Sequence, residues 1–142
     1  MTLLAKIAHR KRTDVLLAAE ALTLLAFFRV CLVLVPVKRI IRALTSTPTG
    51  KPFARDPKSV TRRVRWAVEA VSRNSPAAFV CFPQTLAGYA MLRRRHVLST
   101  MVYGVARSPQ GKLIAHTWLT VGDRIVLGGE GSAAFTPVER WT

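Results

Sequence analysis

The chain has 142 residues, of which 50% are hydrophobic, and carries a formal net charge of +15 at pH 7. This length suits one domain with a modest core and is too short for two, and the apolar content excludes a disordered chain. The excess of lysine and arginine favours acidic partners, whether peptides, proteins, nucleic acid or membrane surfaces, and charge alone does not choose among them.

The N-terminal region is expected to contain two core helices. Residues 15–37 form a long apolar run that is interrupted by Glu20 and Arg29 and ends near Pro36. Each charge in the middle of a bilayer costs about 2.5–3.5 kcal/mol, and the uncharged stretches fall far short of the roughly 20 residues that a span needs. We therefore expect helices that break at Pro36 and do not cross a membrane.

The pair Thr13-Asp14 is expected to cap the first of these helices. Apolar residues then cover most of the helix circumference, which predicts a helix that is buried on more than one side or that meets a partner. Residues 45–57 are rich in Thr, Ser, Pro and Gly and indicate a loop. We accordingly expect an N-terminal helical region at 1–50 and a core at 51–142, together forming one compact unit.

The core is expected to place two helices before a small sheet. Ser59 is predicted to cap a helix that continues to about Arg73. A second helix is predicted to follow a loop and to begin at Cys81, with Pro83 in the first turn, where the missing N–H costs nothing.

Three strands are expected after the helices, at 99–106, 112–121 and 124–127, the last two joined by the two-residue hairpin turn Gly122-Asp123. Helices followed by an antiparallel meander indicate the α+β class.

Cys81 is the candidate nucleophile. A cysteine attacks as its thiolate, which the unpaired N–H groups at a helix start and a neighbouring imidazolium both favour. The same N–H groups suit an oxyanion, and Gln84, one turn further on, could add a side-chain donor. A purely structural cysteine is the plain alternative. The other cysteine, Cys31, lies in an apolar run and is expected to be buried and inert, and a disulfide between the two would block the nucleophile.

His116 is the candidate general base. It lies in a predicted apolar strand, and a nucleophile–base pair forms if that strand packs against the helix of Cys81. A satisfied core histidine is the alternative. The cysteine spacing fits no zinc site, and we expect neither a metal nor a cofactor.

Taken together, these motifs carry a resemblance. Their order resembles that in the B protein of lasso-peptide biosynthesis. The motifs are Cys-x-x-Gln from Cys81, a helix ending Leu-Arg-Arg-Arg, a strand ending Tyr-Gly-Val, Ala-His-x-Trp-Leu around His116, and a later Gly-Gly-Glu. The B protein is the transglutaminase-like leader peptidase, and the similarity covers about 59–138. The N-terminal helices fit its stand-alone form, which lacks a leader-recognition domain of its own.

The resemblance implies a cytoplasmic, papain-like cysteine protease in which Cys81 is the nucleophile and His116 the base. It would remove the leader from a ribosomally made precursor peptide with the help of a small leader-binding protein. A separate lasso cyclase, which uses ATP, would then join the freed amine to an acidic side chain. Gln84 and Trp118 are the expected oxyanion and substrate-binding residues, and neither nucleic acid nor a membrane is an expected partner.

The third member of the triad is where this chain departs from the family. Members commonly place an Asp after the strand that follows the histidine, whereas residues 128–130 are Gly-Gly-Glu. The predicted hairpin pairs His116 with Gly129, so Glu130 points to the opposite face unless a bulge at the glycines restores it. We expect that bulge and give Glu130 the orienting role. Asp123 is a rival at the turn tip, and a dyad held by a backbone carbonyl or water is the alternative.

Two other classes of function stay open at this stage, a catalytically inactive basic binding module and a thiol-dependent acyltransferase of the same superfamily. Two further positions differ from the family. His96 stands where a glycine is common, which predicts an unusual backbone angle, and Thr117 stands where an alanine is common.

Overall fold

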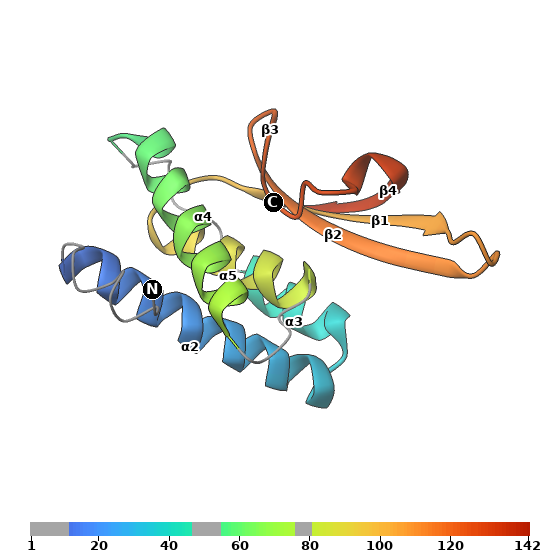
Figure 1. The fold of residues 1–142 in the computed structure, drawn as a ribbon, viewed down its shortest axis with the longest axis horizontal. Helices are drawn as coiled ribbons and strands as arrows, with labels where there is room; N and C mark the ends of the chain where they lie inside the picture. The colour runs from blue at the N-terminus through green and yellow to red at the C-terminus, as the bar shows by residue number, and fades with distance from the viewer. Residues whose placement is uncertain (1–11, 47–54, 76–80) are drawn as a thin grey trace.

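The structure, a computed structural model, describes residues 12–46, 55–75 and 81–142. Within these ranges the helices come first and the sheet follows. The elements are α2 (Arg12–Leu34), α3 (Val37–Thr45), α4 (Pro57–Asn74), α5 (Cys81–Arg94), β1 (Thr100–Arg107), β2 (Leu113–Val121), β3 (Arg124–Leu127), the 3-10 helix η1 (Ser132–Ala134) and β4 (Thr136–Trp141). The helices gather on one side of a small antiparallel sheet (Figure 1), so the predicted α+β class is confirmed.

The first helix, α2, differs from the prediction at its start and in its burial. Thr13 and Asp14 already lie inside the helix, so they do not cap it. Pro36 separates α2 from α3 as expected, because a proline ring cannot continue the preceding helix. Only one side of α2 is buried, so of the two expected alternatives, burial on more than one side is not formed and contact with a partner stays a prediction. Among the described residues, α2 is also the one helix long and apolar enough to cross a bilayer, with 22% of its most apolar stretch buried.

The cap of α4 lies upstream of the predicted residue. The side chain of Asp56 accepts a hydrogen bond of 3.2 Å from the backbone N–H of Ser59, and Pro57 occupies the first turn. Aspartate is a strong helix cap and proline is favoured just inside a helix, so the helix begins two residues before the predicted cap. The predicted loop at 45–57 is described only at its ends.

The sheet has the strand order β3-β2-β1-β4. Three strands lie close to their predicted ranges, and Gly122 has a φ of 58°, as a turn that begins with glycine requires. The fourth strand, β4, was not predicted, because its side chains are almost all exposed and show no apolar alternation. It pairs with the far edge of β1.

Helix α5 lies between the sheet and α2, and this arrangement positions the site (Figure 1). A close approach at Gly88 makes this packing tight. A Cβ added there would lie 2.4 Å from Cδ1 of Leu127 and 3.0 Å from Cδ2 of Leu119. One continuous core runs from Leu17 on α2 through α5 to Leu127 on β3.

The end of α5 has the backbone angle that the sequence predicted. His96 has a φ of 56°, and it follows a helix whose last bonds are His96 N–H to Arg93 O at 3.0 Å and Val97 N–H to Leu92 O at 3.0 Å. This pair of bonds is a Schellman motif, in which the residue with positive φ is usually glycine.

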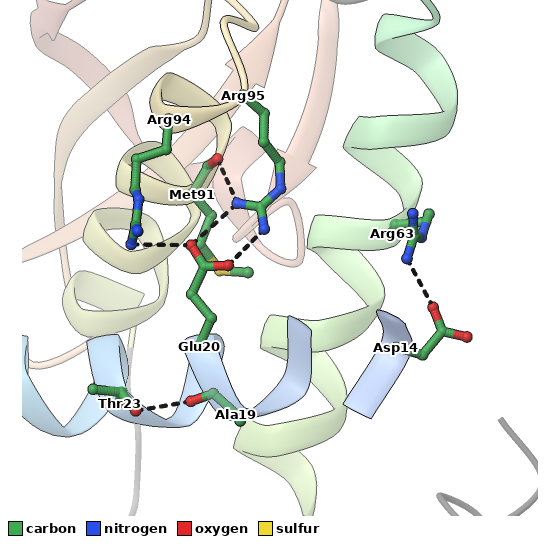
Figure 2. A network of polar contacts seen from close by, with 8 residues as sticks. All are labelled: Asp14, Ala19, Glu20, Thr23, Arg63, Met91, Arg94 and Arg95. Atoms are coloured by element: carbon green, nitrogen blue, oxygen red, sulfur yellow. Dashed lines mark hydrogen bonds and ion pairs between the residues drawn. The ribbon is translucent and has the colours of Figure 1, made fainter. Parts of the chain in front are cut away.

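Three ion pairs join α4 and the end of α5 to α2 (Figure 2). Arg95 at the end of α5 donates to Glu20 Oε1 at 3.1 Å and Glu20 Oε2 at 2.5 Å, and Arg94 lies 3.3 Å from Glu20 Oε1. Near the start of α2, Asp14 pairs with Arg63 of α4 at 3.1 Å. The two carboxylates of α2 are therefore held on the side that faces the rest of the protein, whereas Arg29 is exposed.

Candidate active site

Cys81 is the first residue of α5 and is half-buried. Residues 76–80, where we expected the loop into this helix, lie outside the described residues. Pro83 lies in the first turn and is buried, as predicted. Cys31 is half-buried on α2, and both thiols are free. The structure therefore places the candidate nucleophile at the start of a 14-residue helix, where the backbone N–H groups lack helical partners.

His116 lies in the middle of β2 and is half-buried, with its ring held by a single strong contact. Its Nε2 lies 2.7 Å from the backbone oxygen of Gly128. A carbonyl oxygen can only accept, so Nε2 must carry the proton, and in the neutral ring Nδ1 is then the free proton acceptor. The contact thus selects the tautomer that a general base at Nδ1 requires.

Two aromatic rings pack against the imidazole of His116. The ring centroid of His116 lies 5.9 Å from that of Trp118 and 5.2 Å from that of Phe135. Trp118 is only 6% exposed. A Cβ on Gly104 of β1 would lie 2.8 Å from the Trp118 ring, so glycine makes room for this stack. Trp118 therefore packs behind His116, and its predicted contact with substrate stays a prediction.

The helix of Cys81 and the strand of His116 are joined by a buried contact. Thr85 Oγ1 on α5 and Thr117 Oγ1 on β2 lie 3.2 Å apart. Since side chains alternate along a strand, Thr117 facing α5 puts His116 and Trp118 on the opposite face of the sheet. No hydrogen bond joins the thiol of Cys81 to the ring of His116, both of which are among the described residues.

The hairpin after His116 contains a bulge, but not at the predicted position. Leu119 pairs with Leu127 whereas Thr120 pairs with Ile125, so the extra residue is Val126 rather than one of the glycines. The strand β3 ends at Leu127, and the expected pairing of His116 with Gly129 is not formed. The chain is free to turn away here because the next residue is a glycine with a φ of 72°.

Consequently, the backbone of Gly128 occupies the position beside Nε2 that we had assigned to Glu130. Glu130 is exposed, and the orienting role given to it stays a prediction. Asp123 is exposed at the tip of the hairpin. The structure thus places a backbone carbonyl beside the ring, as the dyad alternative expects, while the pairing of Cys81 with His116 stays a prediction.

A hollow of about 510 Å³ lies between α4, α5 and the segment after β3, and Glu130 is among the residues that line it. Gln84, one turn after Cys81, lines it together with Gly128 and Gly129, and Arg65 and Arg73 of α4 form the opposite wall. The residue that holds His116 and the helix that begins with Cys81 therefore open onto the same space. A peptide segment seated there would contact both elements.

Sequence reasoning missed several residues of this site. Thr85 and Phe135 carry no local signal, because their contacts are made across the fold. Gly104 does carry one, since a glycine inside a strand often marks a close approach. Gly128 contributes its backbone oxygen, and the sequence cannot indicate this role because every residue has such an oxygen.

The comparisons with known proteins agree with the order of elements described above. The model of the transglutaminase-like superfamily matches residues 21–140, beginning within α2 and ending in β4, and so extends well beyond the 59–138 segment of the motif resemblance. No curated protein and no solved structure matches the chain. In this chain, a helix that begins with a cysteine packs on an antiparallel sheet that carries a histidine. Because the family match covers most of the chain, the protein belongs to the transglutaminase-like superfamily.

Proposed function

We propose that the protein is a cysteine peptidase that removes the leader from a ribosomally made lasso-peptide precursor. The superfamily consists generally of cysteine-dependent enzymes, which supports the use of a thiol. The motif resemblance to the lasso B protein supports the finer assignment of the reaction and its substrate. The proposed enzyme acts in the cytoplasm on the precursor peptide, together with a leader-binding protein and ahead of a lasso cyclase.

One observation carries the proposal, the contact between His116 Nε2 and the oxygen of Gly128. It leaves Nδ1 as the base that takes the proton of Cys81. The sulfur then attacks the scissile carbonyl, and N–H groups at the start of α5 donate to the oxyanion, with Gln84 in reach of the same hollow. His116 next protonates the leaving amine, and water hydrolyses the thioester.

In the proposed mechanism, the ring approaches the thiol along the edge of β2 beside His116. Pairing between β2 and β3 covers only Leu119 to Val121, so the edge beside His116 is not paired with β3. In the proposal, the imidazole and Cys81 meet around this edge in the substrate complex. Catalytic hydrogen bonds are often long without substrate and tighten when it binds.

The decisive experiment incubates the purified protein with a lasso precursor and its leader-binding protein, and reads the products by mass. We expect two shorter peptides whose masses sum to the precursor plus water. Cys81→Ala and His116→Ala should abolish them, whereas Cys31→Ala, a matched control on α2, should not. Cleavage by Cys81→Ala would show that this thiol is not the nucleophile, and no cleavage by the parent would support the inactive binding module. A mass increase on an acceptor would identify an acyltransferase.

A second readout does not depend on the substrate. If His116 activates Cys81, alkylation of that thiol by iodoacetamide near neutral pH should slow by about tenfold in His116→Ala, because only the thiolate reacts. His96→Ala is the control, since His96 lies at the far end of α5. Equal alkylation rates would show that the two groups do not act together.

A further inference from the structure

The outer side of α2 is an exposed apolar surface that the proposed reaction does not use. Its large side chains are between about half and four-fifths exposed. These are Leu16 (69%), Leu22 (49%), Phe27 (56%), Val30 (57%), Val33 (82%) and Leu34 (74%). We call this surface the outer face of α2. Contiguous apolar surface of this kind on a folded protein marks an interaction site.

The outer face is continuous along the helix. Its members recur every three or four residues, with the exposed Ala19 and Ala26 between the large side chains. Thr23 is the polar residue in this row, and its hydroxyl donates to the oxygen of Ala19 at 2.9 Å (Figure 2). The Thr23 hydroxyl therefore has its proton in use and can only accept a further hydrogen bond.

The carboxylates of α2 are turned away from the outer face and neutralised. Asp14 pairs with Arg63, and Glu20 pairs with Arg94 and Arg95 (Figure 2). Arg63 belongs to α4, and Arg94 and Arg95 lie at the end of α5 and directly after it, on the buried side of α2. The outer face consequently presents no negative charge to its surroundings.

Cations lie next to the outer face. Lys38, Arg39 and Arg42 are exposed on α3, the helix that follows directly after Pro36, while Ile40 and Ile41 of the same helix are buried. Exposed basic residues thus continue the surface where the apolar residues end. This combination of an apolar helix side and neighbouring cations is typical of helices that lie on anionic membranes.

We propose that α2 lies in the plane of an anionic lipid bilayer, with its outer face in the boundary between head groups and acyl chains and the cations of α3 against phosphate groups. The helix does not span, because Leu17, Ala21, Leu25 and Phe28 on its other side are packed against the protein. Of the two charges that argue against crossing, Glu20 faces the end of α5, and Arg29 is an exposed cation, which suits an anionic surface. This attachment departs from our expectation that a membrane is not a partner.

Two other occupants fit these observations less well. A stable protein interface carries about one hydrogen bond per 100–200 Å², and the outer face, which is almost entirely apolar, provides few groups for them. A second copy of the chain would bring two molecules of net charge +15 together beside the cations of α3, which repel each other. A bilayer requires no directed bonds and is attracted by the same cations.

Flotation of the full chain with lipid vesicles tests the proposal. We expect binding to phosphatidylcholine vesicles that contain phosphatidylglycerol, and weaker binding to pure phosphatidylcholine or at high salt. Phe27→Gln with Val33→Gln should weaken binding by about tenfold or more, because both side chains lose their burial in lipid. Leu113→Gln is the matched control, as Leu113 is 71% exposed on β2, on the sheet side of the molecule.

A charge variant and a fluorescence probe complete the test. Lys38→Glu with Arg42→Glu should weaken binding to the anionic vesicles by about tenfold, whereas Lys112→Glu, at an exposed turn, should not. Emission of Phe27→Trp should shift to shorter wavelength with vesicles, and that of Leu113→Trp should not. Circular dichroism confirms that each variant is folded.

Three outcomes would overturn the proposal. The first is the absence of binding to either vesicle, and the second is equal binding by the outer-face variant and the parent. The third is an oligomer, or a complex with the leader-binding protein, that the outer-face variant loses while vesicle binding is unchanged. That last result would assign the face to a protein partner.

Discussion

Thr85 on α5 and Thr117 on β2 hold their hydroxyl oxygens 3.2 Å apart in a space where each residue is 2% exposed. This contact joins the helix that begins with Cys81 to the strand that carries His116. The threonine at position 117 thus has a hydrogen-bonding partner on the helix. The pair fixes how these two elements pack, four residues from the thiol and one residue from the imidazole.

We predict that the two threonines act as a unit. Thr85→Val or Thr117→Val alone leaves a buried hydroxyl without its partner and should cost about 1–3 kcal/mol of unfolding free energy. The double variant removes both hydroxyls and should cost less than the sum of the single changes. Urea denaturation of the four proteins measures this. Additive costs would mean that the hydroxyls do not interact.

Gly128 is predicted to be needed for activity, because its oxygen holds His116. A Cβ at this position would lie 2.6 Å from the backbone oxygen of Thr117, so Gly128→Ala must displace the segment. A displacement of about 1 Å at a catalytic group can reduce the rate by about 100-fold, and we expect kcat to fall by that order. Gly131→Ala is the control, since Gly131 also has a positive φ, of 73°, but no atom within 4 Å of the added Cβ.

The same assay decides between the carbonyl and Glu130 as the group that orients His116. If the oxygen of Gly128 suffices, Glu130→Gln should retain kcat within about threefold, since a group without contact to the ring contributes little. A loss as large as that of Gly128→Ala, with stability unchanged, would instead support the predicted role of Glu130.

His96→Gly is predicted to stabilise the fold. A side chain with a Cβ in the left-handed region costs roughly 1–2 kcal/mol, and glycine avoids this cost at the end of a helix. The melting temperature of His96→Gly should therefore rise. His96→Ala keeps the Cβ and should not gain stability, so it separates backbone strain from the loss of the imidazole. A drop in the melting temperature of the glycine variant would indicate that the histidine side chain stabilises the fold by more than the strain costs.

Because of Glu20, we expect the free energy of unfolding to fall in acid. Its hydrogen bonds from Arg95, and the positive charges of Arg95 and Arg94, lower the pKa of Glu20 below its usual value of 4.5, although burial opposes this. A lowered folded-state pKa contributes stability at pH values above 4.5 that is lost as the pH falls through the folded value. We expect Glu20→Gln to be less stable than the parent at pH 7, with a difference that shrinks in acid. Chemical denaturation at several pH values measures it, and a constant difference would show that the carboxylate is not the source.

Several features of this protein follow from the sequence alone because short-range physics decides them. The break at Pro36 follows from the geometry of proline, the turn at Gly122 and the strand after it follow from turn chemistry, and the backbone angle at His96 follows from its place after a helix end. The positions of Cys81 at a helix start and of His116 in a strand were also readable, since each depends on the pattern of its own neighbours.

The tertiary structure decided what depends on distant parts of the chain. A helix that is apolar all round gives no sign of which side will be covered, so the one-sided burial of α2 became visible only against α4 and α5. The bulge at Val126 displaced the hairpin from its simple register, and a backbone oxygen rather than a side chain then came to lie beside His116. Every residue carries such an oxygen, so only the folded chain determines which one the imidazole meets.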